Sequence, residues 1–428
     1  MHTPRLSRRH VLQAAAASAI LGPTILSRSA HGHTAASERI GLGFIGVGTM
    51  GRGHVNRFLG FGNVHVVAIS DVVAERAASV KETVETKYAE GLKSGAYKGC
   101  DFHNDFRELL ARDDIDAVVI ATPDHWHALG CVLAAKAKKD IYCEKPLTHT
   151  IAQGRKIVEA VRASNVVFQT GSQQRSEFGG LFRQAVEYVR NGRIGRLMTV
   201  RVGVGPPPVA CELPEEPLPS GTDWNLWLGP APERGYNEIL CPQGVHKHFP
   251  EWRRYREYGG GGLADMGAHH FDIAQWALEM DASGPVEIHP PDGAATRGLR
   301  FVYANGVEMF HGGRSGCTFE GDKGTIYVDR GKIESMPDSI LKEPLTDADK
   351  RVYFSDNHAG NWLDCIASRK DPICTAEIGA RSAAICHLAN IGYALQRPLK
   401  WDPEKEEFPA DSEANKLLDY QMRGEWKL

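Results

Sequence analysis

Features that mark several other classes of protein are missing from this chain of 428 residues. No two cysteines form a Cys-x-x-Cys pair, and no histidine group has the tight spacing of a dedicated zinc motif. Basic residues are not in excess, because the net charge is −3 and becomes −7 without residues 1–36. We therefore predict no metal site and no nucleic-acid partner. The histidines that raise the possibility of a metal site are His125, His127, His246, His248, His269 and His270, for which we favour a structural or substrate-contact role.

Long apolar runs are also scarce. Beyond the N-terminus no segment approaches the ~20 apolar residues of a membrane-spanning helix, so we expect no spanning segment in the mature chain. Residues 7–12 resemble a twin-arginine signal, and an alanine-rich apolar run over 11–26 follows them. We interpret residues 1–36 as an export signal of a periplasmic protein, anchored if the signal is uncleaved. The alternative is a disordered tail with a chance arginine pair.

The nine cysteines are an odd number, which leaves at least one thiol unpaired within the chain. Cys211 could pair with Cys241 in an exported protein, but spacing alone does not fix connectivity. A twin-arginine substrate folds before export, which favours mostly buried free thiols. We see no internal repeat and no low-complexity tract outside the signal.

The most informative stretch is residues 40–71. An apolar strand leads into Gly46-x-Gly48-x-x-Gly51, a short helix follows, and a second strand ends at Asp71. In a dinucleotide site the first glycine permits a tight turn, the second admits the pyrophosphate, and the third lets helix and strand pack closely. Asp71 lies 20 residues after Gly51, the spacing expected for a carboxylate that binds the adenosine ribose. A simple tight turn is the weaker alternative.

Asp71 also predicts the form of the cofactor. Its carboxylate would repel a 2′-phosphate, and the two valines that follow supply no cation to bind one. We therefore expect NAD rather than NADP.

Strands and helices alternate over about 130 residues after Ile40, which predicts a doubly wound parallel sheet. Ligands bind at the carboxyl ends of such strands, so residues 123–127, 144–146 and 171–175 should border one crevice with the glycine loop. We expect these residues at the cofactor: Gly46, Gly48, Thr49, Met50, Gly51, Asp71, Thr122, Pro123, His127, Glu144 and Lys145. We expect these at the substrate: His125, Gln174, Arg175, Trp224, Tyr258 and His270. Loop packing or an oligomer interface is the alternative for the aromatic residues.

The pattern changes after about residue 172. Strand-like runs at 197–203, 299–303, 307–311 and 325–328 lack crossover helices between them, which predicts a largely antiparallel sheet. The predicted fold class is therefore α/β plus α+β. We expect a signal over 1–36, a Rossmann domain over 38–171, a substrate and oligomerisation domain over 172–400, and a tail over 401–428.

Three polar residues could carry out chemistry in the crevice. Lys145, at a strand end, could stabilise negative charge on a substrate oxygen, although most lysines are only surface residues. Asp265 and His269 are four residues apart and would share one face of a helix. His269 could take a hydroxyl proton while Asp265 orients it, or the pair could be a helix cap and a core histidine. The glycines at 259–262 favour the first interpretation, because such a loop lets backbone approach a ligand.

With these motifs assembled, the chain resembles the Gfo/Idh/MocA oxidoreductases, named for glucose–fructose oxidoreductase and inositol dehydrogenase. The resemblance rests on residues 46–51, 122–127, 144–146 and 260–272, and extends from about Glu38 to the C-terminus. It implies a Rossmann domain followed by an open-faced mixed β-sheet domain, often used for oligomerisation. It also implies Lys145, Asp265 and His269 as the catalytic set. The segments 224–229 and 361–364 look like those of an exported bacterial subgroup.

Three functions follow as hypotheses. The first is an NAD-dependent oxidoreductase that removes hydride from a hydroxyl-bearing carbon of a sugar, cyclitol or glycoside. The second is a redox-neutral glycosidase or lyase acting through a transient ketosugar, which suits an exported protein because free NAD is scarce outside the cytoplasm. The third is a non-catalytic sugar-binding protein, against which the intact Lys145, Asp265 and His269 argue. In each case the partner is a small carbohydrate or cyclitol, and a homo-oligomer is expected.

Overall fold

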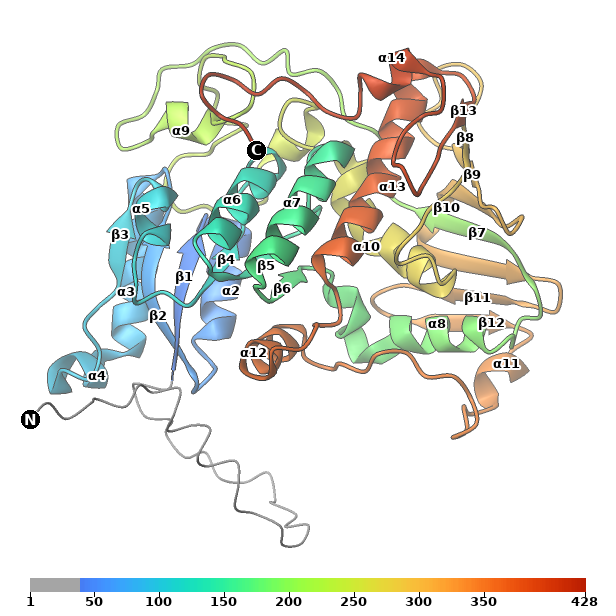
Figure 1. Ribbon diagram of the computed structural model, residues 1–428, viewed down its shortest axis with the longest axis horizontal. Coiled ribbons are helices and arrows are strands. Elements are labelled where there is room, and N and C mark those ends of the chain that lie inside the picture. Colours follow the sequence, from blue (N-terminus) through green and yellow to red (C-terminus); the bar gives the residue numbers. More distant parts are fainter. Residues whose placement is uncertain (1–38) are drawn as a thin grey trace, which may run out of the picture.

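The computed structural model describes residues 39–428, and the predicted export signal lies outside these residues. The described chain forms two β-sheets with helices on and between them (Figure 1). This confirms the predicted α/β plus α+β architecture.

The first sheet has six parallel strands in the order β3-β2-β1-β4-β5-β6. This is the Rossmann order, in which the strand sequence reverses between β1 and β4 and leaves a ligand crevice there. The strands are β1 (Ile40–Ile45), β2 (Val64–Ser70), β3 (Asp101–His103), β4 (Ala117–Ile120), β5 (Asp140–Cys143) and β6 (Phe168–Thr170).

Helices cover both faces of this sheet, and two of them come from far along the chain. One face packs against α5, α6, α7 and the start of α13, and the other against α2, α3 and α12, where Trp362 is fully buried. These helices are α2 (Thr49–Phe58), α3 (Ala74–Lys87), α5 (Phe106–Leu110), α6 (Asp124–Lys136), α7 (Ile151–Ser164), α12 (His358–Ser368) and α13 (Ala376–Leu395).

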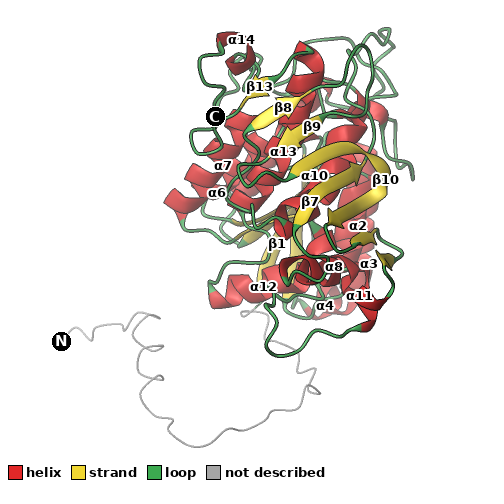
Figure 2. Cartoon of the chain, turned by 90° about the vertical axis from the view of Figure 1, so that its right-hand side faces the viewer, coloured by secondary structure: helices red, strands yellow, loops and turns green. Residues whose placement is uncertain are grey.

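The second sheet has seven strands, and every pairing within it is antiparallel. The strands are β7 (Leu197–Gly203), β8 (Glu287–His289), β9 (Arg300–Val302), β10 (Glu308–Gly321), β11 (Thr325–Val328), β12 (Ile333–Met336) and β13 (Leu399–Lys400). One face packs on α8 (Leu181–Arg190), α10 (Gly261–Ala277) and α13 to form the largest apolar core. The other face carries ion pairs such as Arg201–Glu320, and Figure 2 views the molecule from this side.

Long loops and short helices connect the two sheets. They include α9 (Trp224–Leu228) and the 3₁₀ turns η3 (Gln173–Arg175), η4 (Phe178–Gly180) and η5 (Glu251–Arg254). The smaller helices at the edges are α4 (Ala89–Ser94), α11 (Ser339–Lys342) and α14 (Ser412–Asn415). The C-terminal residues return to the first domain, where Trp426 packs edge-on against Trp126.

Some local predictions differ from the structure. Residues 91–94, which we expected in a loop over 91–99, are helical, because α4 follows α3 after a break at Tyr88. The strands β8, β12 and β13 are too short to give a period-two signal in the sequence. All nine cysteines are free thiols and eight of them are buried, so Cys211 and Cys241 are not paired. No helix among residues 39–428 is long and apolar enough to cross a membrane.

Candidate active site

The glycine loop joins β1 to α2 at the point where the strand order reverses. Gly46 has φ +82°, and a Cβ there would lie 2.9 Å from the Ala121 carbonyl oxygen. A Cβ on Gly51 would lie 2.1 Å from the Gly46 carbonyl oxygen, so only glycine allows α2 to approach β1 this closely. A Cβ on Gly48 would meet no atom within 4 Å, because that residue faces an open pocket. These backbone features form a cradle that fits a pyrophosphate.

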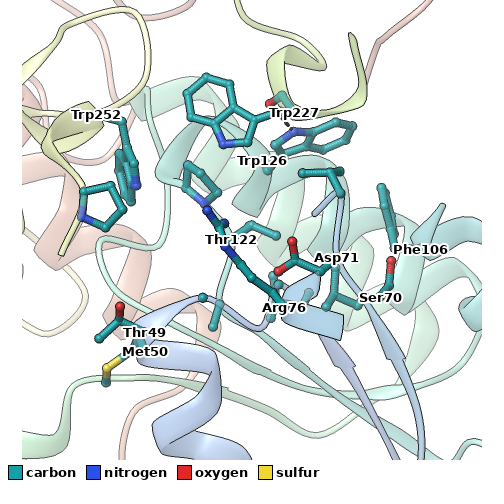
Figure 3. Close-up of a pocket in the computed structure, with 18 of the residues that line it drawn as sticks. Thr49, Met50, Ser70, Asp71, Arg76, Phe106, Thr122, Trp126, Trp227 and Trp252 are labelled. Atoms are coloured by element: carbon teal, nitrogen blue, oxygen red, sulfur yellow. Dashed lines mark hydrogen bonds between the residues drawn. The ribbon is translucent and has the colours of Figure 1, made fainter. Parts of the chain in front are cut away.

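The pocket next to this cradle, the first pocket, encloses about 910 Å³ including the part open to solvent. Thr49 and Met50 line it from the first turn of α2, which carries no acidic side chain to offset the positive end of the helix. Asp71 lies across from them, and the indoles of Trp126, Trp227 and Trp252 line the opposite wall (Figure 3). A glycine cradle, an acid and apolar walls suit a dinucleotide.

Asp71 is buried and also braces the glycine loop. Its Oδ2 accepts a hydrogen bond from the Val47 N–H at 2.8 Å, and its Oδ1 accepts one from the Val73 N–H at 2.9 Å. Each carboxylate oxygen can accept a second bond, so ribose hydroxyls could still bind there. The same carboxylate therefore holds the backbone of the glycine loop and is available in the pocket wall to accept bonds from a ribose.

A segment that the sequence analysis did not identify closes over this pocket. We call residues 237–250 the covering loop. Arg76 donates through Nε to the Gly244 carbonyl oxygen at 2.9 Å, and Thr49 donates to the His248 carbonyl oxygen at 2.8 Å. Arg52 donates to the His246 carbonyl oxygen. Side chains of the Rossmann domain thus hold the covering loop through its backbone carbonyl groups. Because every residue has such a group, these contacts cannot be predicted from the sequence of the loop.

Lys145 and Asp265 meet in a second pocket of about 1110 Å³, also counting the part open to solvent. The Lys145 ammonium donates to Asp265 Oδ1 at 2.6 Å and to the Asp265 carbonyl oxygen at 2.8 Å. Burial alone would raise the pKa of Asp265, but the charges of Lys145 and Arg253 hold it below its ordinary value. An ammonium has three N–H donors, so one remains for a substrate oxygen.

His269 lies one turn further along α10 and lines the same pocket. Its Nδ1 is buried and has no hydrogen-bond partner within the described residues 39–428. Burial, with the charges of Lys145 and Arg330, holds the pKa of His269 well below its ordinary value, so the imidazole is neutral and able to accept a proton. Among residues 39–428 no hydrogen bond joins Asp265 to His269, and the Asp265 carboxylate is bonded to Lys145 instead.

Glu144, the other acid of the strand-end motif, is buried beside Lys145. Its Oε1 lies 2.7 Å from His54 Nε2 and accepts a bond from Gln173 Nε2 at 2.8 Å. Burial would raise the pKa of Glu144, but the His54 hydrogen bond and the Lys145 charge lower it. Glu144 and Lys145 line the second pocket, whereas Thr122 lines both pockets and Pro123 lines the first.

The two histidines of residues 122–127 are buried supports rather than pocket walls. The ring nitrogens of His127 lie 2.7 Å from the Pro146 carbonyl oxygen and 3.0 Å from that of Thr122. His125 Nε2 lies 3.0 Å from the Trp227 carbonyl oxygen, and burial lowers the pKa of His125 to about 3. His127 thus joins two strand-end loops, and His125 joins α6 to α9.

Three other residues expected at the substrate do not line the second pocket. Arg175 is buried in a bidentate pair with Asp272 at 2.8 Å, and Asp281 adds a contact at 2.7 Å. Trp224 stacks on Trp227 at 4.6 Å, within a loop core that also contains Tyr258. Their side chains are occupied by these contacts.

Gln174 and His270 lie behind the pocket wall. Gln174 is buried, and its amide nitrogen lies 3.3 Å from the His269 carbonyl oxygen and 3.2 Å from His270 Nδ1. The amide oxygen accepts a bond from Arg330, which does line the pocket. Gln174 therefore connects α10 to Arg330.

The glycine run at residues 259–262, which leads into α10, packs closely against neighbouring chain. Gly261 has φ +75°, and a Cβ there would lie 2.4 Å from the Pro208 nitrogen. A Cβ on Gly262 would lie 3.1 Å from Gly205 Cα. Gly261 and Gly262 thus pack against the chain at residues 205–208, and none of the four glycines lines either of the two pockets.

Asp124, which the sequence analysis did not select, also lines the second pocket. It is the first residue of α6, and a Cβ on Gly259 would lie 3.2 Å from its Oδ2. Burial raises the pKa of Asp124 to about 8 despite the nearby charges of Lys145 and Arg253. The residue is therefore a protonated acid at neutral pH.

Replacing Asp124 with asparagine should stabilise the protein at high pH. In the unfolded chain the carboxyl ionises near pH 4, so stability from this group is full below that pH and is lost as pH rises towards about 8. Guanidinium unfolding between pH 4 and 9 should show Asp124→Asn gaining on the wild type as pH rises, with Asp292→Asn, a change at an exposed site, as control. A gain of equal size at every pH would contradict this prediction.

The two pockets are adjacent. Both are lined by Met50, Ala121, Thr122, Phe249, Trp252 and Arg253. A ligand that extends from the glycine loop across this shared wall would reach the space that Lys145 and His269 line. The site therefore couples a dinucleotide pocket to a polar reaction pocket.

Comparisons with known proteins agree with this arrangement. A Gfo/Idh/MocA family model described as "Oxidoreductase family, NAD-binding Rossmann fold" matches residues 40–172, and one described as "Oxidoreductase family, C-terminal alpha/beta domain" matches residues 209–428. The myo-inositol 2-dehydrogenase of Thermotoga maritima is 30% identical over 379 residues, which span 84% of this chain and 96% of that protein.

Two further similarities support less, one because it covers a small part of the chain and the other because the sequence identity is low. The α-N-acetylgalactosaminidase of Shewanella oneidensis is 33% identical over 164 residues, only 38% of this chain and 34% of that enzyme. The structure of an aldose-aldose oxidoreductase from Caulobacter crescentus in complex with glycerol superposes with a TM-score of 0.57 at 17% identity, covering 85% of this chain and 99% of that one. At that identity the likeness shows the fold alone.

The chain belongs to the Gfo/Idh/MocA family. It is an oxidoreductase with an N-terminal NAD-binding Rossmann domain.

Proposed function

We propose that the protein oxidises a hydroxyl group of a sugar, cyclitol or glycoside, with NAD in the first pocket as the hydride acceptor. The observation that carries this proposal is the shared wall between the glycine-loop pocket and the pocket of Lys145, Asp265 and His269. Similarity to a myo-inositol 2-dehydrogenase over most of the chain supports a polyhydroxylated substrate.

Each polar residue then has a role at the substrate. His269, neutral and with its Nδ1 unbonded, takes the hydroxyl proton. Lys145 donates its third N–H to the substrate oxygen and stabilises the negative charge that develops there. Asp265 holds the Lys145 ammonium in place through two bonds. When bound, NAD supplies the hydride acceptor.

The form of the cofactor is part of the proposal. Asp71 presents a carboxylate to the first pocket, which disfavours a 2′-phosphate. Arg76 lines the same pocket, but its guanidinium donates to the carbonyl oxygens of Gly244 and Pro242. This arrangement favours NAD over NADP.

We also propose that the protein is exported by the twin-arginine signal over residues 1–36 and carries its cofactor with it as a periplasmic homo-oligomer. The bonds from Thr49, Arg52 and Arg76 to the covering loop support retention of a bound dinucleotide. A protein that keeps its cofactor does not depend on free NAD outside the cytoplasm, but a second substrate with a carbonyl group must take the hydride back from NADH within the site before the next turnover.

One experiment tests the oxidation and the retention together. The exported protein is purified and heat-denatured, and the supernatant is assayed for NAD(H), which should be close to one per chain. The intact protein is then incubated with a panel of sugars, inositols and glycosides, and a ketosugar or ketoinositol is the expected product. Net cleavage of a glycoside without NADH accumulation would instead support redox-neutral glycosidase chemistry. Sugar binding with no hydride exchange to labelled cofactor would indicate a binding protein.

A further inference from the structure

The charged side chains of the second pocket are not evenly matched. Its wall holds four cations and four acids: Arg57, Lys145, Arg253, Arg330, Asp124, Glu144, Glu177 and Asp265. Arg57 pairs with Glu177, Lys145 pairs with Asp265, and Arg253 Nε lies 3.6 Å from the same Asp265 carboxylate. Arg330 forms no ion pair with any acid among residues 39–428.

The protonation of Asp124 leaves this pocket with a positive surplus. Because the pKa of Asp124 is about 8, this acid carries little negative charge at neutral pH, so the four basic side chains outnumber the three other acids. His269 adds no charge, since its pKa is well below the ordinary value. Within residues 39–428 Arg330 is the basic side chain of this pocket that forms no ion pair, although the charges of Asp265, Glu144 and Glu177 act on it. The surplus makes the pocket electrostatically suited to an anion.

Arg330 is nevertheless held in a defined position. It lies in the turn between β11 and β12, where Asp329 Oδ1 accepts bonds from the Gly331 N–H at 2.8 Å and the Lys332 N–H at 3.0 Å. Arg330 Nε donates to the buried amide oxygen of Gln174 at 3.1 Å. That bond occupies one edge of the guanidinium and leaves the two terminal nitrogens available.

The ring of Phe178 supports the guanidinium, whose central carbon lies 4.9 Å from the ring centroid. Phe178 has φ +58°, a left-handed conformation that bulky side chains rarely adopt and that costs about 1–3 kcal/mol. It also lines the second pocket. A strained residue that places an aromatic face beneath an unpaired arginine is typical of a binding site.

We propose that Arg330 binds the carboxylate of an acidic sugar substrate, a uronate, in the second pocket, with Gln174 and Phe178 as positioning residues. This inference rests on the proposed function and specifies the class of its substrate. Two parallel N–H groups match the two oxygens of a carboxylate in geometry and charge. A phosphate dianion would need more than the single surplus positive charge that the pocket offers.

Binding of a carboxylate would also affect His269. The Arg330 guanidinium is one of the charges that lower the pKa of His269. A carboxylate on Arg330 offsets that charge, so the pKa of His269 would move back towards its ordinary value and the imidazole would become a stronger base. A neutral sugar of the same shape would not have this effect.

The test compares matched acidic and neutral sugars. D-glucuronate, D-galacturonate, D-glucose, D-galactose and glucose 6-phosphate are titrated calorimetrically into the purified full-length protein, and kcat/KM is measured for each. The variants are Arg330→Gln, Arg330→Lys and, as control, Arg314→Gln, which removes a cation paired with Glu334 on the outer face of the same sheet. The wild type should favour the uronates.

Arg330→Gln should weaken uronate binding roughly ten- to a hundredfold, the value of a charge-assisted bond, and change neutral-sugar binding less than about twofold. Arg330→Lys should recover part of the loss, and Arg314→Gln should behave as the wild type. Equal losses for acidic and neutral sugars, or a wild type that binds no uronate, would overturn the inference. Tighter binding of glucose 6-phosphate than of glucuronate would overturn the carboxylate assignment.

The binding measurement separates this inference from the proposed function. If no sugar is oxidised but glucuronate binding still requires Arg330, the anion site stands and the oxidation fails. If sugars are oxidised while uronates bind the wild type and Arg330→Gln equally, the oxidation stands and the anion site fails. Circular dichroism and thermal unfolding establish that each variant is folded.

Discussion

Replacing Lys145 with methionine, or His269 with glutamine, is expected to lower kcat by two to four orders of magnitude. A positioned base and a positioned cation each contribute about 10²–10⁴ to such reactions. Both residues line the second pocket rather than the first, so most of the bound NAD should remain. The measurements are turnover with the best substrate of the panel and cofactor content per chain.

Comparing the two variants separates a loss of catalysis from a loss of folded structure. Lys145→Met leaves the Asp265 carboxylate without its strongest partner and could destabilise α10, whereas His269→Gln breaks no ion pair. Lys156→Met, at an exposed ion pair on α7, is the matched control. Near-normal turnover in both Lys145→Met and His269→Gln would refute the proposed catalytic roles.

The other large effect is expected at Asp71. Asp71→Ala removes the acceptor of the Val47 and Val73 N–H groups, so the glycine loop loses its brace and the ribose loses a carboxylate. Two hydrogen bonds from the ribose hydroxyls to this carboxylate would contribute about 1.5–3 kcal/mol each, so their loss corresponds to at least about a hundredfold in affinity. The variant should be purified with little or no NAD, as measured after heat denaturation.

Two further variants sharpen this result. Asp71→Asn retains the size of the side chain but not its charge, and should keep more cofactor than Asp71→Ala. Asp113→Ala changes an exposed acid in the same domain and should keep the wild-type content. Full cofactor content in Asp71→Ala would show that this carboxylate does not hold the dinucleotide.

The first domain could be predicted from the sequence because its signals are local. Gly46, Gly51 and Asp71 lie within one strand–turn–helix–strand unit. In the structure a side chain at Gly46 or Gly51 would clash with backbone atoms, which explains why both residues are glycine. Lys145 follows a buried strand, and Asp265 and His269 share a helix. Those three residues could therefore be chosen by position alone.

The remaining parts of the site depend on contacts between distant segments. Arg175 appeared free in the sequence, but its partner Asp272 is 97 residues away and the two are buried together. Arg330 lies in an ordinary turn between two strands. Its position in the pocket wall depends on a hydrogen bond to Gln174, which is 156 residues earlier in the chain. Asp124 becomes a neutral acid only when the chain around Gly259 buries it. Neither hydrophobic periodicity nor a short motif in the sequence predicts these long-range contacts.

The covering loop has a kinetic consequence for any ligand of the first pocket. Thr49, Arg52 and Arg76 hold its backbone at separate carbonyl oxygens. We therefore expect local unfolding of residues 237–250, which breaks these bonds, to speed the release of a bound dinucleotide. Dissociation would accelerate with mild denaturant and would not respond to the concentration of competing nucleotide. We therefore expect the covering loop to slow the exchange of the cofactor.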